Sequence, residues 1–227
     1  MSLPFRIGDR LPDFLLCSMG GTSKALREYR GRKTLVFLWA SWCPSRDFLG
    51  PLQAFSRRHP GVNVVSIAFD AQGVDPPLRY LTQARATFEM LIDACCILSR
   101  RWGIKRTDLL LLLDENGVLM KMWEAPREAH LEEVQGLLPR EPIRPVPPEP
   151  KVDTKDVRVE LLVQGCTNFL SRKKVQEAVE SLRKALALDP SNRIIARQVL
   201  VLQHPDRFYS GPIDREWVER QPPVQPL

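Results

Sequence analysis

Six prolines lie between Pro139 and Pro150, and this segment constrains the fold more than any other feature of the sequence. Proline has no backbone N–H and a fixed φ. A segment with this many prolines therefore neither continues a helix nor enters the middle of a sheet. It favours an extended, semi-rigid spacer. The sequence therefore predicts two units, residues 1–138 and 158–227, joined by a linker at 139–157.

The first unit alternates strand and helix patterns. Short apolar runs rich in β-formers predict buried strands at 34–40, 62–69 and 109–114. After the last of these, Gly117 and a further run at 118–123 predict a hairpin. Helical spacing is found at 44–58, 76–88 and 127–138. This order predicts an α/β fold, with helices on both faces of a mixed sheet of at least four strands and 34–40 as an interior strand.

The second unit has helical spacing throughout. Its apolar pattern predicts a helical hairpin and a third helix, at 158–170, 173–188 and 192–203. A single hairpin cannot bury its apolar face alone, so this unit must pack on the first unit, on its own third helix or on another chain. Three aromatic side chains are expected anchors for such docking: Phe208, Tyr209 and Trp217.

Composition excludes several classes of function. The net charge of +6 is spread along the chain, without a run of five like charges, so no nucleic-acid partner is predicted. No apolar stretch of about 18 residues is present, so no membrane span is expected. Three scattered histidines and five cysteines without zinc spacing predict no metal and no other cofactor. Charges and prolines near the N-terminus argue against a signal peptide and favour a cytoplasmic protein, although a chain trimmed of its leader would look the same.

Several motifs resemble successive blocks of one family. They are "GDRLPDFLL" (8–16), "LREYRGRKTLVFLWASWCP" (26–44), Pro51, "WGI" (102–104) and "LLLDENGVL" (111–119). In this order they are similar to the TlpA/ResA-type redoxins, which are related to the AhpC/TSA group. The resemblance covers about residues 4–138 and implies a three-layer thioredoxin-like fold, thiol–disulfide oxidoreductase activity and a role in cell redox homeostasis. Relatives of this type often work outside the cytoplasm.

The helical unit resembles a tetratricopeptide repeat. Five residues fall near the pattern of that repeat: Gly165, Ala178, Leu182, Ala185 and Pro190. The resemblance implies a small all-α C-terminal domain that packs through its helical hairpin.

Two positions depart from the redoxin pattern. Arg46 stands where the family carries the second cysteine, so the motif reads WCPSR in place of WCxxC. Asp108 stands where the family carries a cis-proline that faces the cysteines. We expect the peptide bond before Asp108 to be trans, since a cis bond to a non-proline residue costs about 2.5–4 kcal/mol. We also expect Arg46 and Asp108 to face each other as an ion pair.

Cys43 is the candidate catalytic residue. It follows a predicted strand and begins a predicted helix, where free N–H groups favour a thiolate. Arg46 adds a positive charge three residues later, Trp42 would shield one side, and Pro44 suits the first helical turn. The alternative is a buried, inert cysteine beside a solvated arginine.

A single motif cysteine needs a second thiol to complete a redox cycle. Cys95 and Cys96 are candidate resolving residues, and the alternative is that both are small core residues. Cys17 and Cys166 are expected to be structural. Efficient peroxidase chemistry is disfavoured, because the "PxxxTxxC" pattern of peroxiredoxins is absent before Cys43.

Two functions remain open on the sequence. The first is a monothiol oxidoreductase that works through Cys43 with an external thiol or disulfide reductant, or with a protein partner. The second is a redox-inactive redoxin-fold scaffold that uses its helical tail for protein–protein contact or for homodimer formation.

Overall fold

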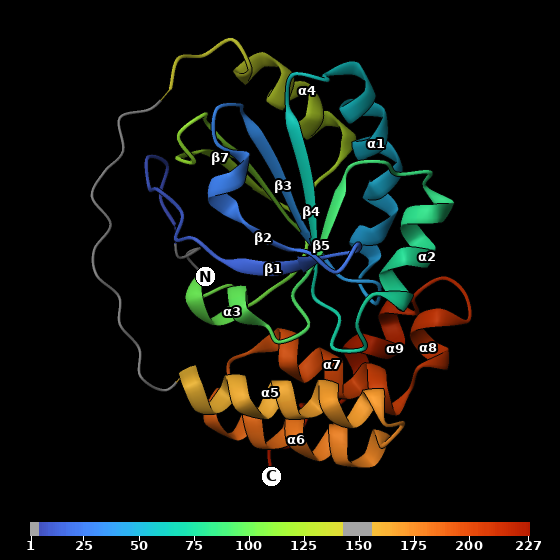
Figure 1. Ribbon diagram of the computed structural model, residues 1–227. Coiled ribbons are helices and arrows are strands. Elements are labelled where there is room, and N and C mark those ends of the chain that lie inside the picture. Colours follow the sequence, from blue (N-terminus) through green and yellow to red (C-terminus); the bar gives the residue numbers. More distant parts are fainter. Residues whose placement is uncertain (1–4, 143–155) are drawn as a thin grey trace.

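A computed structural model describes residues 5–142 and 156–227 (Figure 1). The first unit is built on a seven-stranded sheet in the order β2-β1-β5-β4-β3-β6-β7. The strands are β1 (Leu15–Ser18), β2 (Ser23–Ala25), β3 (Thr34–Trp39), β4 (Asn63–Ala68), β5 (Glu89–Ile92), β6 (Leu109–Leu113) and β7 (Leu119–Glu124). β3 pairs in parallel with β4 and antiparallel with β6, which confirms that it is an interior strand.

Helices cover both faces of this sheet and form the whole second unit. In the first unit they are η1 (Leu26–Tyr29), η2 (Pro44–Phe48), α1 (Leu49–Arg58), α2 (Asp75–Gln83), α3 (Ile97–Arg101) and α4 (Glu128–Leu137). In the second they are α5 (Asp156–Ser171), α6 (Val175–Leu188), α7 (Arg193–Gln203), α8 (Asp206–Tyr209) and α9 (Arg215–Arg220). An α/β thioredoxin-like fold with an all-α C-terminal region is thereby confirmed.

β3 is buried on both faces, and its side chains alternate between two clusters of the core. Phe37 and Trp39 join the cluster beneath α1, α2 and α4. Val36 and Leu38 join the opposite cluster. This double burial explains why the strand is a continuous apolar run, since neither face meets water. Cys43 therefore follows one of the most firmly held strands of the fold.

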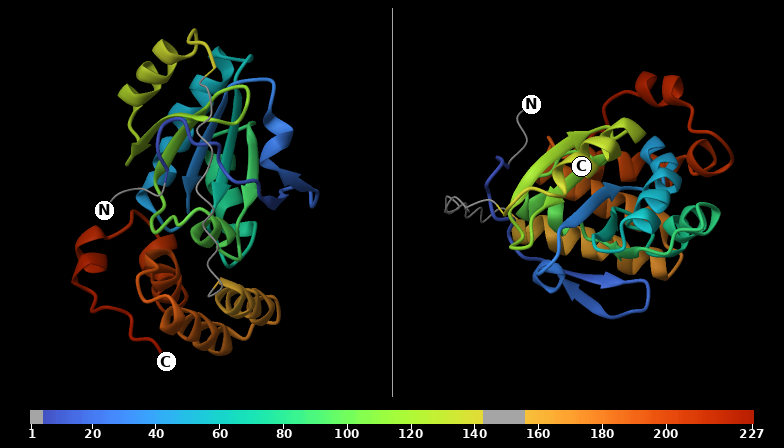
Figure 2. Two further views of the ribbon diagram at one scale, coloured as in Figure 1. Left: turned by 90° about the vertical axis from the view of Figure 1, so that its left-hand side faces the viewer. Right: turned by 90° about the horizontal axis from the view of Figure 1, so that it is seen from above.

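The helical region packs on the end of the sheet. Figures 1 and 2 show α5, α6 and α7 stacked on the side of the sheet where β3 runs into the Cys43 motif. Ile195 and Val199 of α7 belong to the same apolar cluster as Leu38. The Gln198 side-chain oxygen accepts a hydrogen bond of 2.9 Å from the backbone N–H of Ala71. Of the packing arrangements open on the sequence, contact with both the first unit and the third helix is the one observed.

Three details differ from the sequence-based expectations. The helix at 44–58 begins as the 3₁₀ helix η2 and becomes α-helical at Leu49. The helix at 76–88 ends at Gln83, because Arg85 adopts the left-handed conformation with φ +49°, and β5 follows. The hairpin β1–β2 was also not expected.

The linker predicted at 139–157 lies mostly outside the described residues. None of the described helices has the length and apolar content that a membrane span requires.

Candidate functional site

Cys43 lies at the junction of β3 and η2. Its backbone N–H donates to the carbonyl of Ala40 at 3.0 Å, and it is the N-cap residue of the helix that Pro44 begins. The side chain is half-buried. Trp42 is buried beside it, and its indole N–H donates to the carbonyl of Phe69 at 3.2 Å. The expected placement of Cys43, at a helix start and reachable by solvent, is observed.

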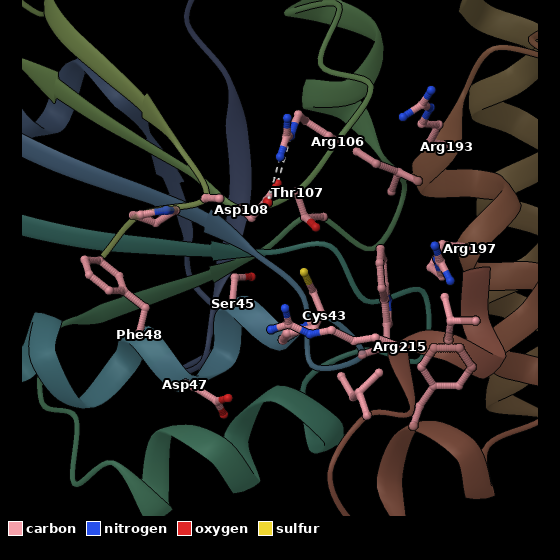
Figure 3. A pocket seen from close by; sticks show the side chains of 18 of the residues that line it. Cys43, Ser45, Asp47, Phe48, Arg106, Thr107, Asp108, Arg193, Arg197 and Arg215 are labelled. Carbon is pink, nitrogen blue, oxygen red and sulfur yellow. Dashed lines mark hydrogen bonds and ion pairs between the residues drawn. The ribbon is translucent and has the colours of Figure 1, made fainter. Parts of the chain in front are cut away.

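Cys43 lines a cavity of about 720 Å³ between the two units (Figure 3). One side, here called the motif wall, comes from residues 42–45, 47, 48, 51, 106–108 and 125–128. The other, here called the helical wall, comes from segments 193–197, 208 and 213–219. The thiol is thus covered partly by a part of the chain that follows the proline-rich segment.

Arg46 is not among the described residues that line this cavity, and its expected effect on the thiol stays a prediction. Its guanidinium lies over the ring of Tyr80, with 4.2 Å between the guanidinium carbon and the ring centroid. It donates four hydrogen bonds, to the carbonyl of Ser41 (2.8 Å), the hydroxyl of Tyr80 (2.6 Å) and the carbonyls of Phe208 (3.0 Å) and Gly211 (3.1 Å). Arg46, at the position of the second cysteine, therefore binds the C-terminal segment to the Cys43 motif through hydrogen bonds.

Asp108 lines the cavity together with Cys43, but its partner is Arg106. The Arg106 guanidinium donates to both carboxylate oxygens, at 3.0 and 2.8 Å, and also pairs with Glu124. The predicted Arg46–Asp108 pair is therefore wrong, because a bidentate partner two residues away already holds the carboxylate. Burial raises the pKa of Asp108, and Arg106 opposes that shift.

The backbone at Asp108 also differs from that of a proline. Its φ is +67°, in the left-handed region, and its N–H donates to the carbonyl of Leu38 at 2.8 Å. As expected, its peptide bond is trans, since no described residue has a cis bond. The groove next to Cys43 thus follows a path that proline cannot adopt.

Two arginines, Arg106 and Arg197, contribute positive charge near Cys43. Cys43 acts electrostatically on both guanidinium groups. Burial lowers the pKa of Arg197, and Cys43 and Glu219 oppose that shift. Sequence reasoning missed both arginines. Arg106 could have been found from the sequence, because it lies two residues before Asp108, which the motif comparison singled out. Nothing in the sequence links Arg197 to Cys43.

Comparison with known proteins agrees with this geometry. A family model described as Redoxin matches residues 6–138, more than half of the chain. The chain belongs to the Redoxin family. This redoxin is 28% identical over 116 residues to thioredoxin-like protein YneN of Bacillus subtilis (strain 168), covering 49% of this chain and 68% of that one. It is 24% identical over 145 residues to thiol-disulfide oxidoreductase ResA of Geobacillus thermodenitrificans (strain NG80-2), covering 57% and 78%.

Solved structures give the same fold. A candidate thiol:disulfide interchange protein, DsbE, from Chlorobium tepidum is 28% identical, with a TM-score of 0.53 over 60% of this redoxin and 95% of that chain. The thioredoxin domain of a thiol-disulfide oxidoreductase from Bacteroides vulgatus has a TM-score of 0.54 at 14% identity, covering 59% and 99%.

The other cysteines of the redoxin lie apart from the cavity. Neither Cys95 nor Cys96 is among the described residues that line it. Cys96 is buried, its sulfur accepts a hydrogen bond from Gln198 at 3.2 Å, and burial raises its pKa. Burial also raises the pKa of Cys166, to about 12. Cys17 is exposed on β1. Within 5–142 and 156–227 none of the five cysteines forms a disulfide, and a resolving role for Cys95 or Cys96 stays a prediction.

A buried carboxyl group joins the motif to the helical region. Asp70 accepts hydrogen bonds from the N–H of Ser41 (3.0 Å) and from its hydroxyl, and burial raises the pKa of Asp70 to about 6. Tyr209 donates to Gln72 at 2.8 Å, and its hydroxyl lies 3.1 Å from that of Ser41. Of the expected aromatic anchors, Phe208 is buried and Tyr209 is in this network, which sequence reasoning did not find.

In 5–142 and 156–227, no group of three or more His, Cys, Asp or Glu side chains is placed to hold a metal ion.

Proposed function

We propose that this protein is a monothiol thiol–disulfide oxidoreductase that acts through Cys43. The observation that carries the proposal is a half-buried thiol that lines an open cavity while the second motif position holds Arg46. Arg106 and Arg197 lie close enough to Cys43 to interact with it electrostatically, and the thiolate is the nucleophile in disulfide exchange. Membership of the Redoxin family supports the same chemistry.

The reaction follows from the single thiol. The Cys43 thiolate attacks one sulfur of a disulfide, a mixed disulfide forms at Cys43, and the other sulfur leaves as a thiolate. Arg46 has no sulfur to attack this mixed disulfide. An external thiol therefore does so, takes over the bound sulfur as a new disulfide and regenerates the Cys43 thiolate. This exchange leaves half of the substrate in a disulfide with the external thiol. A second external thiol that attacks this disulfide completes the two-electron reduction of the substrate, and the two external thiols end as one disulfide.

The neighbours of Cys43 act by position. Trp42 fills the core behind the thiol, and Pro44 begins η2. Asp108 shapes the groove through its left-handed backbone, and Arg46 is a positioning residue that holds the C-terminal segment.

The test is turnover of a small disulfide with an external thiol in excess. Cys43→Ser should lower the rate at least about 100-fold, because the remaining groups supply no nucleophile. Cys17→Ser is the matched control, since Cys17 is an exposed thiol on β1, outside the cavity, and its variant should keep the wild-type rate. Retained turnover in Cys43→Ser would contradict the proposal.

Cys95 and Cys96 are tested in the same assay. If an internal disulfide resolves Cys43, Cys95→Ser or Cys96→Ser should accumulate the mixed disulfide when the external thiol is scarce. We expect no accumulation, because neither residue lines the cavity. Accumulation in either variant would replace the monothiol cycle with an internal two-cysteine cycle.

A redox-inactive scaffold is the second candidate, and the contacts of Arg46 favour it, since they tie the helical tail to the motif. In this function the tetratricopeptide-like hairpin contacts a protein partner or a second copy, and Leu161 and Val175 are exposed for it. Alkylation by iodoacetamide discriminates the two functions. A Cys43 that reacts at neutral pH no faster than a small free thiol supports the scaffold. For either function, we propose a chain organised as a redoxin domain (1–138), a linker (139–157) and a helical domain (158–227). We also propose a cytoplasmic location.

A further inference from the structure

The helical wall of the cavity carries an excess of unpaired positive charge. Arg193, Arg197 and Arg215 line it (Figure 3). Glu219 is the carboxylate of this wall. Within 5–142 and 156–227, the side chains of these three arginines make no hydrogen bond and no ion pair. Arg106 on the motif wall is different, because Asp108 and Glu124 hold its guanidinium. Arg127 on the motif wall also lacks a side-chain partner among the described residues, so three of the four unpaired arginines of the cavity are on the helical wall.

Arg197 is the most informative of these residues. Its side chain is half-buried and close enough to Cys43 to interact electrostatically. Removing a guanidinium from water is costly unless an acceptor replaces the lost hydration. Arg193 lies four residues earlier on α7, so the two side chains project from one face of the helix into the same cavity. Such a pair is suited to an anion that arrives from solvent.

The cavity has the dimensions of a small-molecule site. A volume of about 720 Å³ falls within the range of about 300–1,000 Å³ that is usual for ligand pockets. Phe208, Ile213 and Val218 add apolar surface to the helical wall. The helical wall covers one side of the Cys43 thiol. Less surface around the thiol is therefore accessible to a folded protein substrate than in a groove without this wall.

We propose that this cavity binds a small thiol compound that carries carboxylates, with Arg193, Arg197 and Arg215 on the carboxylates and its sulfur against Cys43. The planar fork of arginine matches a carboxylate, and it is more weakly hydrated than an ammonium group. This proposal rests on the proposed function, and it names the external thiol of that cycle by its charge and size. The compound enters as a thiolate and attacks the substrate sulfur of the mixed disulfide. The bond between this sulfur and Cys43 breaks, the Cys43 thiolate is released, and the compound leaves in a disulfide with that part of the substrate.

Three small disulfides of similar length test the charge preference: dithiodipropionate (dianionic), hydroxyethyl disulfide (neutral) and cystamine (dicationic). The rate of mixed-disulfide formation at Cys43 is measured by mass spectrometry and divided by the rate for a small free thiol. The dianion should react at least about tenfold faster than the dication. Arg197→Gln should reduce this ratio severalfold, and Arg193→Gln, Arg197→Gln together should bring it near one.

Arg172→Gln is the matched control. Arg172 is an exposed arginine between α5 and α6, outside the cavity, so the same change in net charge should leave the ratio at its wild-type value. An equal loss in Arg172→Gln would overturn the proposal, because the preference would then reflect the net charge of the protein.

A binding measurement separates this proposal from the proposed function. The thioether 3-(methylthio)propionate carries a carboxylate but cannot exchange disulfides, and its binding to Cys43→Ser is followed by NMR. Saturable binding that Arg197→Gln abolishes supports the anion site, even if Cys43 exchanges with none of the disulfides and the proposed function fails. Equal rates for the three disulfides overturn the anion site and leave the proposed function standing. No exchange and no binding overturn both.

Discussion

The two walls of the cavity differ in how their charges are satisfied. On the motif wall, Arg106 is held by Asp108 and Glu124, and the thiol is placed by the end of β3. On the helical wall, Arg193, Arg197 and Arg215 have no such partners among the described residues. The contrast separates two tasks. The family motif supplies the sulfur, and the region beyond the proline-rich segment supplies most of the free positive charge, since Arg127 is the unpaired arginine of the motif wall among the described residues.

Arg46 connects the two walls. It lies in the motif, yet two of its hydrogen bonds go to carbonyls of the C-terminal segment. A cysteine at this position would offer one weak donor, whereas a guanidinium offers five donors in a fixed fork. The change at this position therefore removes a thiol and adds an attachment for the helical wall.

The largest expected effect is that of Asp108→Pro, which restores the family residue on the motif wall. Asp108 has φ +67° and donates its N–H to the carbonyl of Leu38, and proline can do neither. We expect the free energy of unfolding to fall by more than about 3 kcal/mol. Denaturant unfolding measures it.

Asp108→Asn is the matched control, because asparagine tolerates the left-handed region and keeps the N–H. Its cost should stay near 1 kcal/mol, the net value of a typical hydrogen bond. If Asp108→Pro were as stable as Asp108→Asn, the groove would have kept the geometry of the family, and the divergence of the motif wall would be refuted.

The next effect concerns pH and the junction behind the motif. Burial raises the pKa of Asp70 from its usual 3.8 to about 6, against the hydrogen bonds from Ser41. Between these values the folded protein binds more protons than the unfolded chain, so stability falls as the pH rises. This contribution is fully present below pH 3.8 and is lost by about pH 6, a change of about 3 kcal/mol.

The measurement is the free energy of unfolding at several pH values for wild type and Asp70→Asn. Other carboxyl groups, such as Asp189, have lowered pKa values and produce the opposite slope, so the difference between the two proteins is compared. Wild type should lose stability relative to Asp70→Asn as the pH rises from about 4 to 6. If the difference in free energy of unfolding between the two proteins did not change with pH, burial would not raise the pKa of Asp70.

Arg46→Ala should have a somewhat smaller effect, about 2 kcal/mol. Hydrogen bonds to charged groups contribute about 1.5–3 kcal/mol, but several bonds from one side chain are not additive. The loss should concentrate in the C-terminal segment, so limited proteolysis around α8 and α9 should become faster. Arg46→Lys keeps the charge without the fork and should recover only part of the stability. If Arg46→Ala were cleaved no faster than wild type, Arg46 would not hold the C-terminal segment on the motif wall.

The comparison of the walls also explains how much the sequence reveals. β3, β6 and the position of Cys43 were predictable, because each follows from a short local pattern. The four-residue strand β5 was missed, since it directly follows a helical pattern. The contacts of Arg46 with Phe208 and Gly211 were not predictable, since they join residues 162 and 165 positions apart. The opposite charges of Arg46 and Asp108 suggested an ion pair, but in the folded chain the Arg46 guanidinium binds backbone carbonyls instead.

The smallest effect tests how the helical wall is attached at its far end. Lys105 of the first unit pairs with Asp189 after α6 at 2.7 Å, and both side chains are partly exposed. Lys105→Ala should cost less than about 1 kcal/mol, since exposed pairs are screened by water and salt. Asp189→Ala should cost more, because Asp189 also accepts hydrogen bonds from Ser191 (2.9 Å) and from the buried Asn192 (3.0 Å).

Unfolding of both variants at low and at high salt separates the two contributions. Salt screens the ion pair, so wild type and Lys105→Ala should converge as salt rises. It does not replace the hydrogen bonds that Asp189 accepts, so the deficit of Asp189→Ala should persist. Equal costs for the two variants would mean that the pair alone holds this end, and the helical wall would then be attached chiefly by charge. A persistent difference would instead show that its attachment depends on buried polar contacts, as it does at Arg46.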